Sequence, residues 1–232
     1  MSLIKKISER LGFSQEPKLP VPDFYKPYMA LFEKKEDENT LLSKAEYAII
    51  DSEATGLDLE KDEIISIGGV TLINQSIDIS QSISFYIKGR KISDREAPAL
   101  HGILPDQPFG MDEFSALEAL INFIGNKIIV GHYIGFDLKM INLLLKKYGA
   151  PPLKNKVLDT AELTKRLDFP LRNYQFAVNK EYTLDALCAR YGVIPKARHT
   201  AAGDAYITAI LFQKLLSDLD KKGISQVKDL KR

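Results

Sequence analysis

Four acidic side chains and one histidine have the types and positions that metal-assisted hydrolysis requires. The acids are Asp51, Glu53, Asp137 and Asp204, and the histidine is His199. Two of the acids end an apolar run, one opens a predicted helix, and one lies in a helix among small residues. Strand ends and helix starts are where α/β folds place their functional groups, so we expect these residues to converge.

The charge of this group favours divalent cations. Four carboxylates carry a charge of −4, which two divalent cations would balance, and so many hard oxygen ligands fit Mg²⁺ or Mn²⁺ better than zinc. Two such ions about 3.5–4 Å apart can activate a water and stabilise the leaving oxygen of a phosphodiester. A histidine whose pKa lies near neutrality is suited to take the proton from that water. Taken singly, each acid also fits a solvated surface position, so the hypothesis depends on the whole group.

The elements that must position these residues alternate in type along the chain. Apolar runs predict strands over 46–51, 63–74, 78–88, 127–133 and 156–160. Helical spacing, with Gly or Pro as stop signals, predicts helices over 112–125, 136–149, 184–192 and 200–219. Strands that come first, followed by strands alternating with helices, predict an α/β fold in which helices cover a mixed sheet.

The composition excludes several classes of protein. The 232 residues contain 32 Lys and Arg against 31 Asp and Glu, which excludes a histone-like polycation but leaves room for a local basic groove. A single cysteine, Cys188, excludes a disulfide framework and a Cys-rich zinc site. No apolar run is long enough to span a membrane, and the N-terminus does not resemble a secretory signal. We therefore expect a cytoplasmic protein without a membrane segment.

The chain is expected to divide into three parts. Residues 1–45 predict an N-terminal arm, made of an amphipathic helix, a Pro-rich linker and a helix packed on the main domain. Residues 46–220 predict the main domain, and residues 221–232 a short C-terminal tail.

Three motifs in order carry a resemblance to a known family. They are DSEATGLD (51–58), GHYIGFD (131–137) and HTAAGDA (199–205), and two connecting signatures, HGI (101–103) and LDT (158–160), also match. The sequence resembles the DEDDh group of 3′→5′ exonucleases in the ribonuclease H-like superfamily, and within it the proofreading exonucleases of bacterial DNA polymerase III. The resemblance implies a five-stranded mixed sheet with helices on both faces.

The resemblance also implies roles for individual residues. Asp51, Glu53, Asp137 and Asp204 would hold two Mg²⁺ or Mn²⁺ ions, and His199 would be the general base. The residues that would contact the substrate are Thr55, Gly56, Leu57, His101 and Phe136. The substrate would be the 3′ end of single-stranded or frayed DNA, and the products nucleoside 5′-monophosphates.

The chain departs from the family pattern at a few positions. Ser52 and Ala54 stand where the family often has Thr, but neither side chain is a ligand, so we expect little effect on the chemistry. Tyr133 and Ile134 stand where the family often has Asn-Ala, which leaves the substrate contacts of that loop open. The resemblance implies association with a polymerase, although residues 221–232 are shorter than the polymerase-binding tail of that subunit.

Two alternatives stay open from the sequence. The first is an exoribonuclease of the same group that trims short RNA or RNA 3′ ends. Only a contact to the 2′-hydroxyl would distinguish RNA from DNA as the substrate, and no residue in the sequence indicates whether that contact exists. The second is a catalytically silent module that binds nucleic acid or a partner. Among the remaining residues, we expect Asp159 and Asp185 to cap helices, His132 to be structural and Cys188 to lie in the core.

Overall fold

A five-stranded mixed sheet forms the centre of the molecule. The computed structural model describes residues 19–34, 37–89, 110–169 and 177–231. The strands are β1 (Glu46–Ala54), β2 (Ile64–Ile73), β3 (Ser76–Tyr86), β4 (Ile128–Gly131) and β5 (Val157–Asp159). Their order is β3-β2-β1-β4-β5, which places β1 in the middle. The first three strands are antiparallel neighbours, whereas β4 and β5 run parallel to β1.

The antiparallel part of the sheet is a meander held by a tight turn. Asn74 and Gln75 connect β2 to β3, and both have positive φ angles, 49° and 61°. Two successive residues in the left-handed region are typical of the two-residue turn whose twist matches that of paired strands. The short connection that the sequence predicts around Gln75 is therefore present.

Most of the main helices begin at a residue whose side chain caps the helix, and such residues can be recognised in the sequence. The main helices are α2 (Tyr25–Ala30), α4 (Glu113–Ile124), α5 (Gly135–Lys147), α6 (Thr160–Asp168), α7 (Leu184–Tyr191) and α8 (Ala201–Lys221). Two short 3₁₀ helices cover Asn179–Tyr182 and Val227–Lys231. Asp112 caps α4, Asp159 caps α6 and Thr200 caps α8, each through a side-chain oxygen that accepts a backbone N–H.

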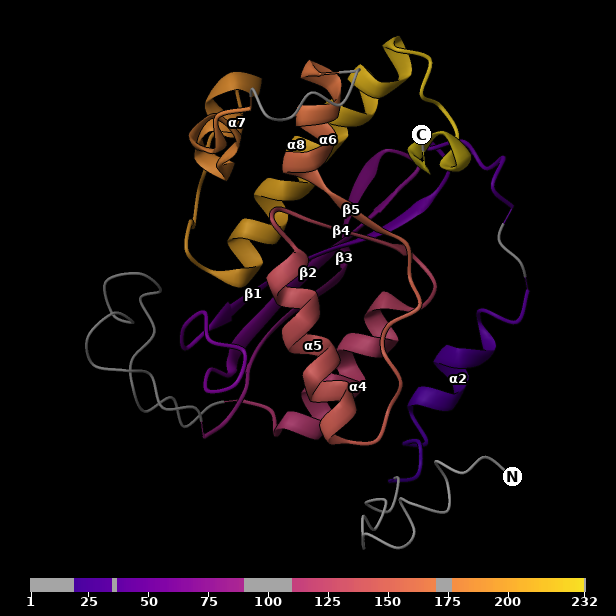
Figure 1. The fold of residues 1–232 in the computed structure, drawn as a ribbon, viewed down its shortest axis with the longest axis vertical. Helices are drawn as coiled ribbons and strands as arrows, with labels where there is room; N and C mark the ends of the chain where they lie inside the picture. The colour runs from indigo at the N-terminus through magenta and orange to yellow at the C-terminus, as the bar shows by residue number, and fades with distance from the viewer. Residues whose placement is uncertain (1–18, 35–36, 90–109, 170–176, 232) are drawn as a thin grey trace, which may run out of the picture.

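Helices cover both faces of the sheet (Figure 1). Helices α6, α7 and α8 pack on one face, and α2, α4 and α5 pack on the other. Alternate residues of β1 divide between the two cores: Tyr47 and Ile49 contact the α8 side, whereas Ala48 and Ile50 contact the side of α4 and α5. Because β1 is covered on both faces, its apolar residues form a continuous run rather than an alternating pattern.

Helix α2 is fixed to the domain by aromatic side chains. The hydroxyl of Tyr25 donates to the carbonyl of Pro152 at 2.9 Å, and that of Tyr28 donates to Oδ1 of Asn155 at 2.6 Å. Asn155 in turn donates to the carbonyl of Lys127, directly before β4, at 2.7 Å. The helix expected to pack on the main domain is thus anchored at the end of the sheet where β4 begins.

The segments on either side of the domain pair with each other. The N–H of Leu42 donates to the carbonyl of Ser225 at 2.8 Å, and the N–H of Val227 donates to that of Thr40 at 3.0 Å. The guanidinium of Arg166 then holds the carbonyls of Asp229 and Leu230, at 2.7 and 2.8 Å. Residues near 40 and near 227 are therefore packed on the domain together.

The predicted fold, a five-stranded mixed sheet with helices on both faces, is confirmed. The amphipathic helix expected near the N-terminus and the HGI signature lie outside the described residues. Within the described residues, no helix is long and apolar enough to cross a membrane. One local prediction is wrong: Thr183, not Asp185, caps α7, because its hydroxyl accepts the N–H of Ala186 at 3.3 Å.

Candidate active site

The site forms around the last residues of β1. Asp51 and Glu53 are two positions apart on this strand, so both project from the face that α8 covers. In the antiparallel register, Asp51 lies opposite Gly68 and Glu53 lies opposite Ser66, with a bulge directly after Glu53. The bulge ends the regular pairing and lets the chain turn away from the sheet.

Helix α8 approaches the sheet closely beside Asp51. A Cβ atom placed on Gly68 would lie 2.2 Å from the backbone nitrogen of Ala202, so any larger residue in β2 would push the helix away. Gly203 is constrained as well, since its Cβ would lie 2.0 Å from the carbonyl oxygen of Ala197. The run of small residues in the third motif is therefore a packing requirement that brings Asp204 to the strand.

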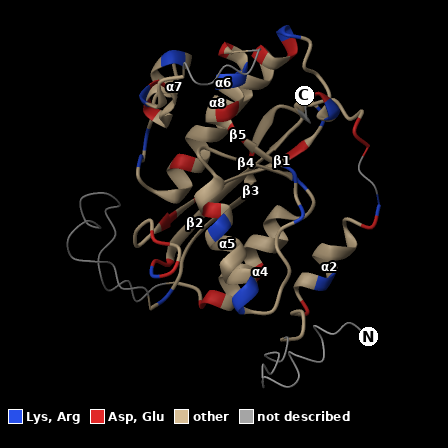
Figure 2. Ribbon diagram, viewed as in Figure 1, with Lys and Arg blue, Asp and Glu red and all other residues tan. Residues whose placement is uncertain are grey.

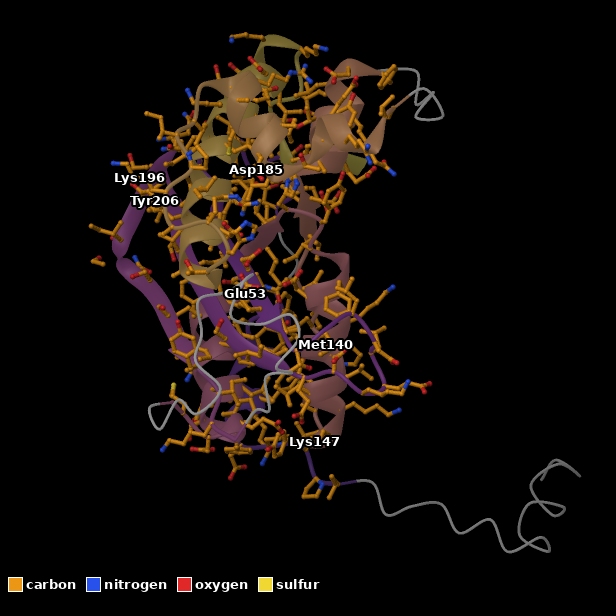
Figure 3. All side chains as sticks on the ribbon, turned by 90° about the vertical axis from the view of Figure 1, so that its left-hand side faces the viewer. Glu53, Met140, Lys147, Asp185, Lys196 and Tyr206 are labelled. Atoms are coloured by element: carbon orange, nitrogen blue, oxygen red, sulfur yellow. The ribbon has the colours of Figure 1, made fainter. Side chains whose placement is uncertain are left out.

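Three carboxylates meet as a result. Oxygen atoms of Asp51, Glu53 and Asp204 lie within 4.8 Å of one another. In Figure 3, Glu53 lies near the centre of the face, with Asp185 above it and Met140 below it. The Oδ1 atom of Asp204 is buried and has no hydrogen-bond partner in the described part of the chain. A buried carboxylate oxygen without a donor is an expected feature of a cation site.

Asp137 joins the group from the first turn of α5 and is held from the opposite side. Its Oδ1 accepts hydrogen bonds from the backbone N–H of Ser52 at 3.0 Å and from the Ser52 hydroxyl at 2.5 Å. Ser52 points to the α5 face of β1, between the two acids that point to the α8 face. The structure thus brings Asp137 to the end of β1 but leaves it outside the tight cluster of three.

Burial and mutual repulsion disfavour the charged form of these acids. Burial, together with Asp137, Asp204 and Glu53, raises the pKa of Asp51 well above its ordinary value. Burial and the neighbouring acids raise the pKa of Glu53 to about 7, and burial also raises the pKa of Asp137. Acids that resist ionisation alone are stabilised when a cation arrives, because opposite charge favours the ionised form.

Arg198 is a part of the site that the sequence did not single out. Its guanidinium forms an ion pair with Oδ2 of Asp204, and its Nε donates to Oδ1 of Asp185 at 2.7 Å. The guanidinium also lowers the pKa of Asp51 and of Glu53, against the effect of burial. A charge run such as Lys196 to Arg198 usually indicates solvated surface, so no local pattern pointed to this contact.

His199 lies on the short loop that precedes α8. Its side chain is exposed, and its backbone has a positive φ of 62°, as does Ala197 at 55°. The hydroxyl of Thr200 holds this loop by donating to the carbonyl of Ala197 at 2.8 Å. Ala197 and His199 are thus two non-glycine residues in the left-handed region, only two positions apart. Such a conformation costs free energy, so the loop next to the acids is held in a strained backbone geometry.

The loop after β1 is folded around Asp62. Oδ1 of Asp62 accepts the Thr55 hydroxyl at 2.8 Å, and Oδ2 accepts the backbone N–H of Asp58 at 2.7 Å. Gly56 leaves space for this side chain, because a Cβ would lie 2.5 Å from Asp62 Oδ2 and would displace it. Leu57, at the tip, is 84% exposed, which leaves an apolar side chain free to contact a ligand beside the acids.

The other predicted residues have mixed outcomes. Phe136 packs half-buried against the core under α5, and His101 lies outside the described residues. His132 is largely buried: burial lowers its pKa to about 4, and Nδ1 lies 2.8 Å from the Thr160 hydroxyl. Cys188 lies in the core as expected. Beyond capping α6, Asp159 accepts the N–H of Ile134 at 3.1 Å, which fixes the start of α5.

The donor set fits small divalent cations. All the gathered ligand atoms are carboxylate oxygens, the donors that Mg²⁺ and Mn²⁺ prefer. Comparison with known proteins identifies the family. A sequence model of the exonuclease family that includes ribonuclease T matches residues 48–212. The chain belongs to this exonuclease family.

The chain is similar to curated DNA polymerase III proteins. It is 32% identical over 188 residues to DNA polymerase III subunit epsilon of Aquifex aeolicus, a match that covers 80% of this chain and 88% of that protein. It is also 32% identical over 183 residues to the PolC-type DNA polymerase III of Listeria innocua, which covers 78% of this chain but only 12% of that protein. The predicted family, DEDDh 3′→5′ exonucleases resembling the polymerase III proofreading subunit, is confirmed.

Solved structures agree on the fold. E. coli exonuclease I in complex with a dT13 oligonucleotide superimposes with a TM-score of 0.65 at 15% identity, covering 78% of this chain and 43% of that one. The zinc-bound exonuclease I–ssDNA complex gives a TM-score of 0.63 at 17% identity, covering 77% and 43%. These structures confirm the predicted ribonuclease H-like fold. The family match and the curated relative, rather than these structures, show that the protein is an exonuclease, a phosphodiester hydrolase.

Proposed function

We propose that the protein removes nucleoside 5′-monophosphates from the 3′ end of single-stranded or frayed DNA with the help of two divalent cations. The observation that carries this proposal is the meeting of Asp51, Glu53 and Asp204 within 4.8 Å, with a buried Asp204 oxygen that lacks a donor. When bound there, Mg²⁺ or Mn²⁺ would act as a Lewis acid at the scissile phosphate.

Each residue then has a distinct task. Asp51, Glu53 and Asp204 hold the cations, and Asp137, fixed by Ser52, completes the ligand set. His199, exposed on its loop, accepts the proton of the attacking water.

The loop after β1 binds the terminal nucleotide. Leu57, the exposed tip, packs against the terminal base, while Thr55 and Gly56 form the backbone of that subsite. Phe136 and His101 remain proposed substrate contacts on the family resemblance alone, and His101 lies outside the described residues.

Nucleic acid is the proposed partner, and a polymerase is a further one. Exonuclease I binds single-stranded DNA in its solved complexes, and the relatives named above are replicative polymerase components. Lysines and arginines are interspersed with acids along the described ribbon (Figure 2), and individual basic side chains would make the phosphate contacts.

The test compares matched DNA and RNA oligomers that carry a label at the 5′ end. With Mg²⁺ or Mn²⁺, we expect a ladder of DNA products shortened one nucleotide at a time from the 3′ end, and a 3′-phosphorylated oligomer should resist. Preferential shortening of the RNA oligomer would favour the exoribonuclease alternative. Purified protein that shortens neither oligomer with either cation would contradict the proposal and favour a binding module.

A further inference from the structure

Arg198 connects two acids that lie on different helices. Its side chain is only 20% exposed, and it contacts Asp185 in the first turn of α7 and Asp204 in the first turn of α8. The contacts with Asp185 are 2.7 Å from Nε and 3.3 Å from Nη2. The guanidinium therefore has a fixed place between the acid cluster and α7.

This position gives Arg198 a charge effect that a surface arginine would not have. Its partner Asp204 is 8% exposed and belongs to the cluster with Asp51 and Glu53. Gathering several buried carboxylates costs free energy through desolvation and repulsion unless a positive charge is near. A guanidinium in contact with one of them reduces that free energy whenever no cation is bound.

We infer that Arg198 is an internal counter-ion of the acid cluster, which stabilises the ligand set in the cation-free protein and opposes cation binding by its own charge. The inference rests on the proposed cation site. Asp185 moderates the effect, because its carboxylate offsets part of the charge of Arg198. In the triad of Asp185, Arg198 and Asp204, removing the charge of Arg198 and removing that of Asp185 should therefore change cation affinity in opposite directions.

The first variant removes the charge at the centre of the triad. Arg198→Gln should lower the melting temperature in EDTA by roughly 5 °C or more, since it leaves Asp204 without its partner. It should also bind Mn²⁺ about 10-fold more tightly, because a positive charge next to the site is gone. Saturating Mn²⁺ should therefore restore much of the lost melting temperature. Arg198→Lys keeps the charge and should stay near the unmodified protein in both measurements.

The second variant removes the charge of Asp185, which pairs with Arg198 from α7. Asp185→Asn keeps the Arg198–Asp204 pair but leaves the charge of Arg198 less offset, so Mn²⁺ should bind a few-fold more weakly. The matched control is Arg190→Gln. Arg190 on α7 also pairs with an aspartate, Asp168, at 2.6 and 2.7 Å, but that pair does not contact the acid cluster. Its loss should leave Mn²⁺ affinity unchanged.

The experiment is a titration of each purified variant with Mn²⁺ alone, with free Mn²⁺ read by electron paramagnetic resonance, alongside thermal melts in EDTA and in saturating Mn²⁺. Tighter binding in Arg198→Gln with weaker binding in Asp185→Asn would support the inference. Equal or weaker binding in Arg198→Gln would overturn it, and if that variant does not fold, unchanged affinity in Asp185→Asn would overturn it. No Mn²⁺ binding by the unmodified protein would instead overturn the proposed cation site.

Discussion

Two helices bring an acid to the end of β1, and the two acids are supported in different ways. Asp137 on α5 is held by neutral donors, the backbone N–H and the hydroxyl of Ser52. Asp204 on α8 is held by a cation, the guanidinium of Arg198. A hydrogen bond fixes the direction of a carboxylate with little change in net charge, whereas an arginine also compensates its charge. Asp137 on α5 is therefore held in position only, whereas Asp204 on α8 is held in position and its charge is partly neutralised.

Removing the charge of either acid tests this difference most strongly. Asp204→Asn and Asp137→Asn should each reduce turnover at least about 1,000-fold, because several kcal/mol of transition-state stabilisation depend on the bound cations. In EDTA the melting temperatures of the two variants should differ. Asp137→Asn should melt higher than the unmodified protein, since burial of its charge is relieved, whereas Asp204→Asn should not, since it loses the pairing with Arg198. Identical melting shifts would remove the distinction between the two sides.

The next largest effect is expected from a substitution at Gly68, where α8 packs closely on β2. Gly68→Ala places a methyl group on the backbone of Ala202 and should reduce the free energy of unfolding by about 1–3 kcal/mol, with activity lost through displacement of Asp204. Gly135→Ala is the matched control, because the added Cβ at the start of α5 meets nothing within 4 Å. Chemical denaturation of both variants measures the difference. A fully active and stable Gly68→Ala protein would contradict the described packing.

The pH dependence of cation binding follows from the raised pKa values. The pKa of Glu53 is raised from 4.5 to about 7, so protons compete with Mn²⁺ below that pH and affinity should fall as the pH decreases from 8 to 6. The folded protein binds this proton more tightly than the unfolded chain does. The stability contribution is thus present at low pH and lost as the pH rises through about 7.

Melting temperatures in EDTA should accordingly be higher at pH 6 than at pH 8. Calorimetric Mn²⁺ titrations at the two pH values complete the test. An affinity that does not change with pH would show that the acids are ionised throughout this range.

The smallest effect is expected at Ser52. Ser52→Ala removes the hydroxyl donor to Asp137 but keeps the backbone donor, so Mn²⁺ affinity should weaken by about 10-fold at most. Ser52→Thr retains a hydroxyl and serves as the control. If Ser52→Ala binds Mn²⁺ as tightly as the unmodified protein, the backbone contact alone positions Asp137.

The sequence predicted the strands, most of the helices and the approach of the acids to one another, although Asp137 stays outside the cluster of three. The apolar run before Asp51 predicted the central strand, and the small residues around Asp204 predicted the close packing of that helix. Both signals are local, because strand periodicity and steric size are properties of neighbouring residues.

The supporting residues could not be found in this way. Ser52 acts on an acid 85 positions further along the chain, and no local pattern reports such a contact. Arg198 belongs to a basic run of the kind that is usually solvated, and the direction of its long side chain depends on where α7 lies. Asp185 was expected as a cap, yet Thr183 takes that place and leaves Asp185 to pair with Arg198. Contacts between distant elements are what the sequence alone leaves undetermined.

The anchoring of α2 determines where a label or a linker can be attached to the protein without covering the acids. Because β1 and β4 are parallel, the Tyr28–Asn155–Lys127 contacts lie at the end of the sheet opposite the acids. Leu19, which precedes α2 and is 57% exposed, offers a labelling position on the segment that leads into this anchored helix. A fluorophore or a bead linker introduced there would leave the acids facing free solution, which suits the chain to single-molecule measurements of strand shortening.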